Sequence, residues 1–583
     1  MRHPVLRPAP PHPAGLVVAT LFAVLATTPS LLPRDWLFQG LVSGVSGAAG
    51  YGVGVAGAWL LRRSSRWRAW RARVDVRVRD RVPARLRRAG LPLLGVLAAA
   101  ALVVALAVGA GWQRELTTAM GMPSTTTSGW LRAAPLLVLV AGVLVGVGRG
   151  VGLLVRLAAA GLRRLRVPSG VAGLVATLLV ATGLVVVVDD VLLARALSAV
   201  DAAFRGSNQA DLPGAPAPVE ADRTGGPGSL VAWETLGHWG RAFVDGELSA
   251  ATLAAAPRGA VADPVRVYVG IDSAEGAAAR ADLAVAELER VGGFDREVLL
   301  VVTTTGSGWV NAAAVDALEL LHGGDTAAVA TQYSYLPSWL SFLVDRSRAE
   351  VEARALYDAV EARVEAMPAD EQPRLLSYGE SLGSLGSESV FTSLADIRAR
   401  SDGAVWSGPP HANTVWHALV ERRDPGTPEA EPVYASGLVV RFADDAADIA
   451  EPPTPWEEPR VLYLQNRSDP VVWWSPELLL ERPDWLAEPP VDGDRPTMTW
   501  YPVVTFWQLT FDLVNAKSVP DGHGHNYEAV LLDAWAAVAA PEGWTDADTA
   551  SAHLVLDPLL DPLLDPLLDQ VPDEVPPVQE QEG

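Results

Sequence analysis

The sequence has no cysteine and only one lysine, Lys517, among its 46 basic residues. Without cysteine the chain cannot form a disulfide, a thiolate metal site or a cysteine nucleophile. Acidic residues are scarce at first: residues 1–188 hold 22 basic and four acidic residues, whereas the rest of the chain holds 24 and 64. The shift in charge near residue 188 predicts a domain boundary. The acidic part lacks the basic surface that binding to phosphates requires, so we expect no nucleic-acid partner.

Long apolar runs come before this boundary. They cover residues 15–32, 37–61, 91–112, 133–148 (or on to 162) and 169–188. A bilayer core of about 30 Å needs roughly 20 apolar helical residues. The first run could be a signal peptide, but no small-residue cleavage site precedes Leu31 to Arg34, so an anchor is the better interpretation. Residues 1–188 are therefore predicted to form an all-α transmembrane domain of about five helices, with the lipid bilayer as partner.

The arginines predict the orientation of these helices. Segment 62–88 has twelve Arg and segment 149–166 has five, whereas the segments between them have few. Cytoplasmic loops carry such an excess. A surface for nucleic acid or anionic lipid is the alternative interpretation of 62–88, but orientation explains the alternation better. We expect a multi-pass protein of the cell membrane with residue 189 onward outside the cytoplasm, provided that the fourth run crosses.

The remaining chain divides by composition and pattern. Residues 189–235 read as a linker and juxtamembrane segment, because 205–230 are rich in Gly and Pro. Residues 236–543 alternate helical patterns with six apolar strands, at Val265–Gly270, Val298–Thr303, Ala327–Gln332, Arg374–Tyr378, Gly403–Ser407 and Arg460–Gln465. This alternation predicts an α/β fold with a mostly parallel sheet and helices on both faces. Residues 544–583 repeat Asp-Pro-Leu-Leu and are predicted to be disordered, because proline every fourth residue opposes a regular helix.

A Gly-x-Ser-x-Gly string directly follows the fourth strand, at Gly379–Gly383. Glycines on either side of a serine let the chain turn sharply from strand to helix, and this turn exposes the hydroxyl. The string alone has low specificity in a chain with 52 Gly, but its place between a strand and a helix is what such a turn requires. We predict that Ser381 is a nucleophile.

A serine nucleophile needs a base, and the base needs an acid to orient it. A parallel sheet with this serine turn indicates an α/β-hydrolase-type fold, on which the acid and then the histidine follow the serine along the chain. Asp469 comes just after the strand Arg460–Gln465, and His523 and His525 lie in a Gly-rich loop further on. Asp469 is the predicted acid, and His525 is preferred to His523 as the base because it lies nearer the following helix.

A metal site formed by Asp521, His523 and His525 is a weaker alternative, because no Cys and no further His lie near them. We expect no metal and no cofactor. The oxyanion of a tetrahedral intermediate needs backbone donors. The N–H of Leu382 is one candidate, and Gly306 or Ser307, in the Gly-rich loop after the second strand, is the other.

At these residues the chain resembles a bacterial family of polytopic membrane proteins, α/β-hydrolase family 9, over nearly its whole length up to about residue 540. The strings that carry the likeness are 29–34, 39–40, 305–310, 332–338, 379–383, 468–474 and 522–525. The resemblance implies a hydrolase whose substrates are poorly defined. Residues 500–516 read as helical, so the usual final strand before the histidine is expected to be short or missing.

We therefore expect a membrane-anchored serine hydrolase, esterase- or lipase-like, that acts on a small-molecule or lipid ester, such as a cell-envelope component. The alternative is a non-catalytic membrane scaffold or lipid-transport partner that has kept a hydrolase fold.

Overall fold

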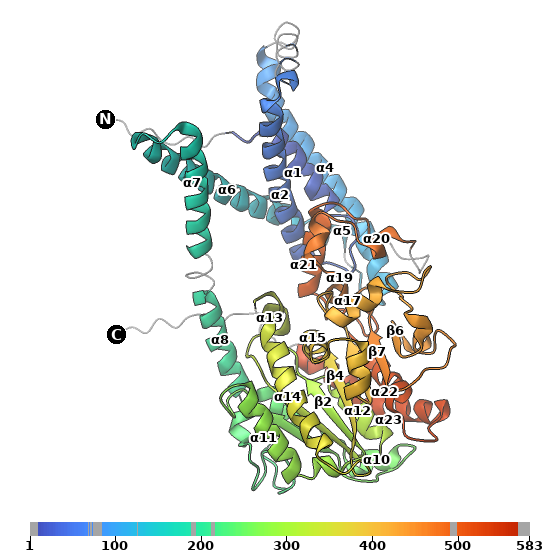
Figure 1. The fold of residues 1–583 in the computed structure, drawn as a ribbon. Coiled ribbons are helices and arrows are strands. Elements are labelled where there is room, and N and C mark those ends of the chain that lie inside the picture. The colour runs from blue at the N-terminus through green and yellow to red at the C-terminus, as the bar shows by residue number, and fades with distance from the viewer. Residues whose placement is uncertain are drawn as a thin grey trace. The chain divides into compact units, whose positions relative to one another are not determined.

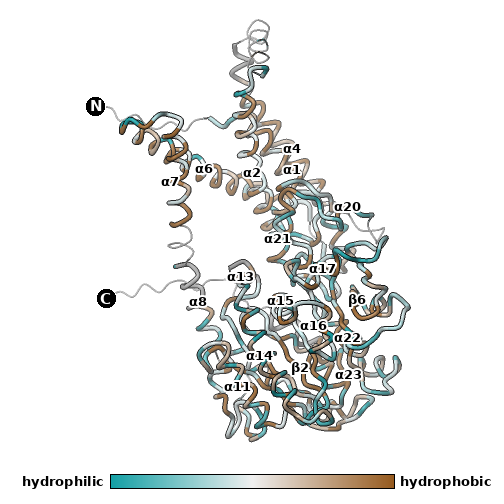
Figure 2. The backbone as a smooth tube through the Cα atoms, in the orientation of Figure 1, coloured by the Kyte–Doolittle hydropathy of each residue, from teal (hydrophilic) through white to brown (hydrophobic). Residues whose placement is uncertain are grey.

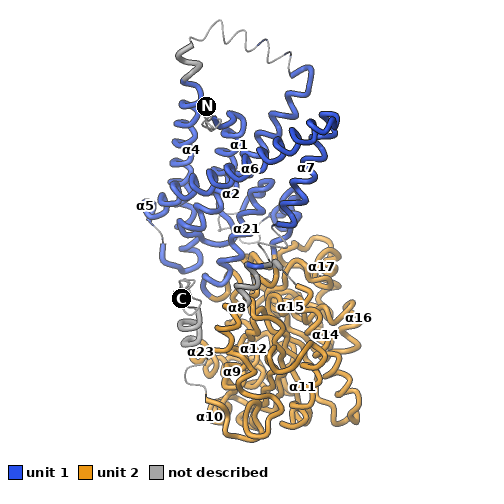
Figure 3. Tube along the Cα trace, turned by 90° about the vertical axis from the view of Figure 1, so that its left-hand side faces the viewer, with its two compact units in different colours: residues 1–199, 473–520 blue, residues 200–472, 521–583 orange. Residues whose placement is uncertain are grey.

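The computed structural model describes residues 10–67, 69, 73, 84–124, 126–187, 194–210, 216–344, 346–489 and 498–568. The chain divides into two compact units, coloured separately in Figure 3. Unit 1 comprises residues 1–199 and 473–520, and unit 2 comprises residues 200–472 and 521–583. Each unit therefore combines segments that are distant in the sequence.

Unit 1 is built of helices (Figure 1). From the N-terminal segment they are α1 (Pro13–Leu25), α2 (Trp36–Arg63), α4 (Ala84–Ala119), α5 (Thr127–Trp130), α6 (Ala133–Arg164) and α7 (Ser169–Val186). The later segment adds η5 (Pro476–Leu479), α20 (Asp484–Ala487) and α21 (Val504–Val514).

Four helical stretches are long and apolar enough to cross a membrane: Trp36–Arg63, Ala89–Ala119, Thr127–Arg164 and Ser169–Val186. Their apolar character is visible along α2, α4, α6 and α7 in Figure 2. The fourth predicted run continues without a break as α6 through Arg164. The first run is shorter than expected, because α1 has 13 residues and ends four residues before Pro29, which cannot continue a helix. The region thus has four candidate spans and one shorter apolar helix.

Glycines allow close packing of α1, α2 and α6. A Cβ atom placed on Gly54 of α2 would lie 2.4 Å from the carbonyl oxygen of Ala14 in α1. A Cβ atom on Gly44 would lie 2.7 Å from the Cβ of Val140 in α6. Side chains at these positions would force the helices apart.

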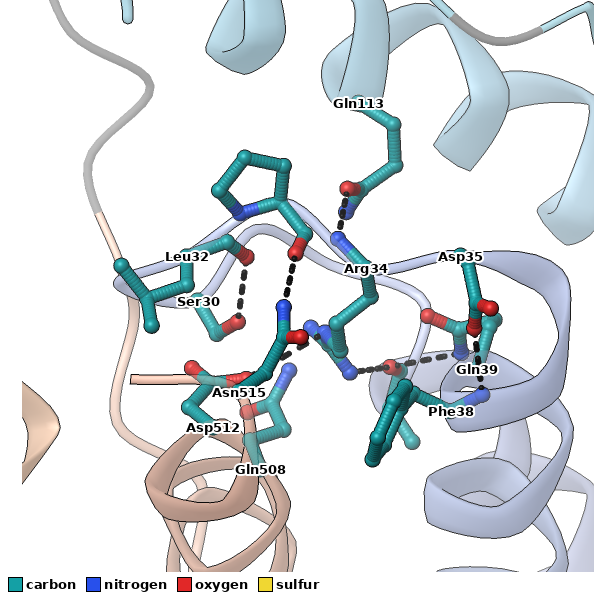
Figure 4. A network of polar contacts seen from close by, with 12 residues as sticks. Ser30, Leu32, Arg34, Asp35, Phe38, Gln39, Gln113, Gln508, Asp512 and Asn515 are labelled. Carbon is teal, nitrogen blue, oxygen red and sulfur yellow. Dashed lines mark hydrogen bonds and ion pairs between the residues drawn. The ribbon is translucent and has the colours of Figure 1, made fainter. Parts of the chain in front are cut away.

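Residues 473–520, which the sequence placed inside the catalytic domain, belong to unit 1. Figure 4 shows Gln508, Asp512 and Asn515 of this segment directed toward the loop that joins α1 and α2. Gln508 Nε2 donates to the carbonyl oxygen of Thr28 at 3.1 Å, and Asn515 Nδ2 donates to that of Pro33 at 3.2 Å. Hydrogen bonds across some 480 residues of sequence therefore fix α21 within unit 1.

A buried ion pair lies at the centre of this network. Arg34 Nε is 3.7 Å from Asp512 Oδ1, and both side chains are buried. The guanidinium also donates to the carbonyl oxygens of Ala26 and Thr28, at 3.3 and 3.1 Å. The backbone N–H of Arg34 donates to Gln113 Oε1 at 2.7 Å. Backbone carbonyls and the carboxylate together compensate the guanidinium for its loss of water.

Unit 2 contains a seven-stranded, all-parallel sheet in the order β1-β3-β2-β4-β5-β7-β6. The strands are β1 (Val265–Val269), β2 (Val298–Thr303), β3 (Thr326–Thr331), β4 (Arg374–Glu380), β5 (Gly403–Ser407), β6 (Val440–Ala443) and β7 (Arg460–Leu464). All six predicted strands are present, and the predicted α/β-hydrolase-type fold is confirmed. The sequence missed β6, which has only four residues and includes Arg441, whose guanidinium is bound by backbone carbonyls.

Helices cover both faces of the sheet. The helices after residue 236 outside segment 473–520 are α9 (Gly237–Asp245), α10 (Ala250–Ala255), α11 (Ala277–Arg290), α12 (Ala312–Leu321), α13 (Ser338–Val344), α14 (Ser347–Glu365), α15 (Leu382–Ser389), α16 (Leu394–Arg400), α17 (Thr414–Glu421), α18 (Ala446–Ile449), α19 (Pro470–Trp473), α22 (Leu531–Ala539) and α23 (Asp546–Leu568). Short 3₁₀ turns are η2 (Trp233–Thr235), η3 (Gly293–Asp295), η4 (Ala435–Gly437) and η6 (Glu528–Val530).

The order of the strands decides which helix covers which face. The chain moves back across the sheet from β2 to β3 and forward again from β3 to β4. Because parallel crossovers are right-handed, α12 lies on one face, and α11, α14 and α15 lie on the other. The packing agrees, since α14 contacts α11 and α15, whereas α12 contacts α22. The carboxyl ends of β2 and β4 therefore flank a switch point, where ligands bind in open α/β sheets.

Two segments differ from the sequence-based expectation. The predicted linker 189–235 contains the helix α8 (Ala194–Gln209), and its residues 189–193 and 211–215 lie outside the described residues. The predicted disordered tail 544–583 begins with α23 (Asp546–Leu568), and residues 569–583 are not described. Thr545 and Asp548 cap α23 reciprocally, and Ala552 and Leu556 are buried. This cap and this packing favour a helix in spite of the prolines.

Candidate active site

Ser381 lies at a sharp turn between β4 and α15, as the Gly-x-Ser-x-Gly string predicted. Its backbone has φ 57° and ψ −126°, a strained conformation for a residue with a side chain. The side chain is only half-buried, although its neighbours on both sides are buried. The turn is held from the next strand, because the N–H of Ser381 donates to the carbonyl oxygen of Ser407 at 2.9 Å. The serine hydroxyl is thus presented at the carboxyl end of the sheet.

The two glycines of the string are needed for close backbone contacts. A Cβ atom on Gly379 would lie 2.4 Å from the carbonyl oxygen of Gly383. A Cβ atom on Gly383 would lie 2.4 Å from the carbonyl oxygen of Thr303, the last residue of β2. Both contacts are with backbone, which cannot move aside easily. Only glycine lets α15 begin this close to the strands.

His525 and Asp469 form a buried pair. His525 Nδ1 is 2.6 Å from Asp469 Oδ2, and both residues are buried. Asp469 Oδ1 accepts a hydrogen bond from the N–H of Val471 at 2.8 Å. The second ring nitrogen of His525, Nε2, is buried and has no hydrogen-bond partner among the described residues. An imidazole held at Nδ1 by a carboxylate, with Nε2 available, has the geometry of a general base.

The end of β5 connects Ser381 with the histidine. The carbonyl oxygen of Ser407 accepts the Ser381 N–H, and the next residue, Gly408, lies against the ring of His525. Gly408 has φ +55°, and a Cβ atom there would lie 2.3 Å from His525 Cε1. Two consecutive residues at one strand end thus contact the backbone of Ser381 and the ring of His525, which lie 144 positions apart in the sequence. No pattern in the sequence pointed to Gly408.

His523, the alternative base, lies in the same loop and is half-buried. Its carbonyl oxygen accepts the N–H of Asn526 at 3.3 Å. Asp521, a member of the alternative metal set, uses its carboxylate to accept the N–H groups of Gly522 and Ala529, at 2.9 and 2.5 Å. Within the part of the chain that is described, no group of three or more His, Cys, Asp or Glu side chains is placed to hold a metal ion.

The predicted oxyanion donors come from two segments, the start of α15 and the loop after β2. Leu382 is the first residue of α15 and is buried. The N–H of Gly306 donates to the Tyr333 hydroxyl at 2.8 Å, so the structure gives this N–H a partner that the sequence did not suggest. Ser307 is half-buried, and its hydroxyl accepts the indole N–H of Trp239 at 3.1 Å. The second donor stays a choice between Gly306 and Ser307, and the contact of the Gly306 N–H with Tyr333 favours Ser307.

Sequence reasoning did not single out two further residues beside the pair. The Tyr527 hydroxyl donates to Asp469 Oδ2 at 2.7 Å, and the N–H of Asn466 donates to the Tyr527 hydroxyl at 3.1 Å. Burial raises the pKa of Tyr527 well above its ordinary value, and the negative charge of Asp469 adds to this, so the hydroxyl stays protonated and donates. Both residues lie within a few positions of the candidate acid or base. This closeness in the sequence was the one signal that could have identified them.

Comparison with known proteins agrees with the fold. Residues 265–552 match the model of a family described as the alpha/beta-hydrolase family, and residues 27–247 match the model described as the N-terminus of that family. No curated protein and no solved structure matches the chain. The two matches cover both the helical N-terminal region and the parallel sheet with its Gly-x-Ser-x-Gly turn, and we conclude that the chain belongs to the alpha/beta-hydrolase family, in the branch that carries its own N-terminal domain.

Proposed function

We propose that the protein is a serine hydrolase that cleaves carboxylic esters by a Ser-His-Asp mechanism. The observation that carries the proposal is the hydrogen bonding of the two ring nitrogens of His525. One ring nitrogen is bonded to Asp469 at 2.6 Å, and the other is buried with no hydrogen-bond partner in the described part of the chain. A buried polar atom without a partner costs free energy, so its retention favours a use in binding or catalysis.

In this mechanism Ser381 Oγ attacks the ester carbonyl carbon while His525 Nε2 takes the hydroxyl proton. Asp469 stabilises the imidazolium that forms. The carbonyl oxygen becomes an oxyanion, which the N–H groups of Leu382 and Ser307 would stabilise. The C–O bond then breaks, and the alkoxide leaves with the proton from Nε2.

Water next attacks the acyl-enzyme and gives its proton to Nε2. The tetrahedral intermediate collapses, the proton returns to Ser381 Oγ, and the carboxylic acid is released. The cycle needs no metal and no cofactor, because the three side chains supply the nucleophile, the base and the orienting acid.

A lipid or cell-envelope ester is the proposed substrate class. The support is the N-terminal region of the same chain, which has four helices long and apolar enough to cross a membrane. A hydrolase tethered at a bilayer meets esters whose acyl chains partition into that bilayer. The bilayer would thus determine which esters reach the enzyme, whereas the Ser-His-Asp steps would be the same for any ester.

The test is covalent labelling by a fluorophosphonate, which reacts with activated serines whatever the natural substrate. Full-length protein in detergent should be labelled at one site, and Ser381→Ala should reduce the labelling rate by roughly 10³-fold or more. Ser389→Ala is the matched control, because Ser389 lies at the other end of α15 and donates to Gly386. Equal labelling of Ser381→Ala and wild type would overturn the proposal in favour of a non-catalytic scaffold.

A further inference from the structure

The loop that carries His525 is not supported by a strand of its own. Between Asp469 and His525 the described residues form α19, η5, α20 and α21, and they contain no strand. Residues 473–520 of this stretch belong to unit 1. Sheet hydrogen bonds therefore do not set the position of the base. Other contacts must do so.

Side chains of the loop after β7 supply those contacts. Ser468 Oγ accepts the N–H of Gly524 at 2.9 Å. Asn466 Nδ2 donates to the carbonyl oxygens of Gly524 and Asn526, at 2.9 and 3.0 Å. The backbone on both sides of His525 is thus hydrogen-bonded to two side chains of the loop that also carries Asp469. These bonds take the place of a strand ladder.

Tyr527 connects the same two loops through the acid itself. Its hydroxyl donates to Asp469 Oδ2 at 2.7 Å, the oxygen that also faces His525 Nδ1 at 2.6 Å. The hydroxyl accepts the Asn466 N–H at 3.1 Å, which fixes its direction. The rings of Tyr527 and His525 meet edge to face, with centroids 5.7 Å apart. Tyr527 is 1% exposed, so water does not compete for these bonds.

We propose that Tyr527 is a positioning residue for the base: it holds the Asp469 carboxylate, and through it the His525 ring, in the geometry that proton transfer from Ser381 requires. This inference rests on the proposed function. Asn466 acts with Tyr527, since it holds the backbone of the histidine loop with its side chain and the tyrosine hydroxyl with its N–H.

Loss of the hydroxyl has two separable consequences. The carboxylate loses one of its donors and can rotate, so the base is oriented less often and the rate of serine attack falls. Because hydrogen bonds to charged groups are among the stronger ones, we expect the rate to fall roughly ten-fold. In addition, Asp469 Oδ2 keeps more negative charge for His525, which favours the protonated imidazole. The acidic limb of the pH–rate profile then moves to higher pH.

The experiment measures the second-order rate of fluorophosphonate labelling of full-length protein between pH 5 and 9. Tyr527→Phe should lower the plateau rate about ten-fold and shift the acidic limb upward by several tenths of a pH unit. Tyr357→Phe is the matched control. Tyr357 lies on α14 and is also buried. Its hydroxyl donates to the backbone carbonyl oxygen of Arg400 at 2.6 Å. It should leave both quantities unchanged.

Asn466→Ala provides a second variant that does not depend on the tyrosine. It should lower the plateau rate while leaving the acidic limb in place, because the Asn466 side chain holds the loop backbone and not the carboxylate. A wild-type rate and a wild-type limb in Tyr527→Phe would overturn the positioning role, and so would equal changes in Tyr357→Phe. If Ser381→Ala is inactive at the same time, only the positioning role fails and the proposed function stands.

Discussion

Gly408 lies directly against His525: a Cβ atom on this glycine would come within 2.3 Å of the ring carbon Cε1 and 2.6 Å of Nδ1. The same Cβ atom would lie 3.0 Å from Asp469 Oδ2. Position 408 also has φ +55°, a conformation that costs a residue with a side chain roughly 1–2 kcal/mol. Even one methyl group here must displace the imidazole from its carboxylate.

Gly408→Ala is therefore expected to reduce fluorophosphonate labelling of Ser381 by at least about 100-fold while the protein still folds, because the displaced ring no longer serves as base. Gly206→Ala is the control, since a Cβ atom at Gly206 would meet nothing within 4 Å. Labelling rates and thermal unfolding of both variants should be measured. Wild-type labelling of Gly408→Ala would show that His525 does not act where the structure places it.

The two candidate histidines are expected to separate cleanly. His525→Ala should remove labelling almost completely, because the ring bonded to Asp469 is lost. His523→Ala should change the rate by less than about ten-fold, since the pair of His525 and Asp469 remains in place. Labelling rates of the two variants at one pH show which histidine is the base. A larger loss in His523→Ala than in His525→Ala would reverse the assignment.

Asp512→Ala is expected to destabilise unit 1 strongly. It leaves the Arg34 guanidinium buried without its carboxylate, and the loss of one partner of a buried pair typically costs about 3–5 kcal/mol. The double variant Arg34→Met with Asp512→Leu should lose much less, because it leaves no buried charge. Thermal unfolding in detergent of Arg34→Met, Asp512→Leu and their double variant gives the coupling. Additive losses would mean that the two residues do not interact.

The side of the membrane can be tested without removing any native cysteine, because the chain has none. The Arg-rich segments 62–88 and 149–166 predict that residue 189 onward lies outside, and this holds whether or not the 13-residue α1 crosses the membrane. A membrane-impermeant maleimide applied to intact cells should label Val219→Cys, at a position that is 82% exposed in unit 2. It should not label Leu165→Cys, at a 76% exposed position after α6. The opposite pattern would place unit 2 in the cytoplasm.

The docking of α23 is expected to weaken at alkaline pH. Hydrogen bonds to Asp533, and then to Asp557, raise the pKa of His553 to about 9. A histidine with a raised folded-state pKa stabilises fully below its unfolded value of about 6.5, and that stability is lost as the pH rises through 9. Solvent screening limits the effect to on the order of 1 kcal/mol. Limited proteolysis of α23 should accelerate between pH 7 and 10 in the wild type, whereas His553→Gln should be cleaved at one rate throughout.

The sequence by itself determined the features that depend on neighbouring residues. Apolar runs specify the six predicted strands and the long helices of unit 1, because burial of a strand or a membrane span leaves a continuous local pattern. The turn at Ser381 was predicted for the same reason: a strand, two glycines and a helix follow one another within about fifteen residues. The short strand β6 was missed because an arginine interrupts its apolar pattern. The capped helix α23 was missed because three prolines argue against a helix there.

Only the tertiary structure decided what depends on contacts between distant residues. It chose His525 as the partner of Asp469, revealed Tyr527 and Gly408 beside them, and placed residues 473–520 in unit 1 through contacts such as that of Arg34 with Asp512. Two histidines two positions apart in a Gly-rich loop cannot be distinguished by their local sequence. A glycine that makes room for an imidazole is likewise not identified by the residues next to it in the sequence. Such choices arise when separate strand ends and loops meet, and the free energy that settles them comes from packing and hydrogen bonds that form only in the folded chain.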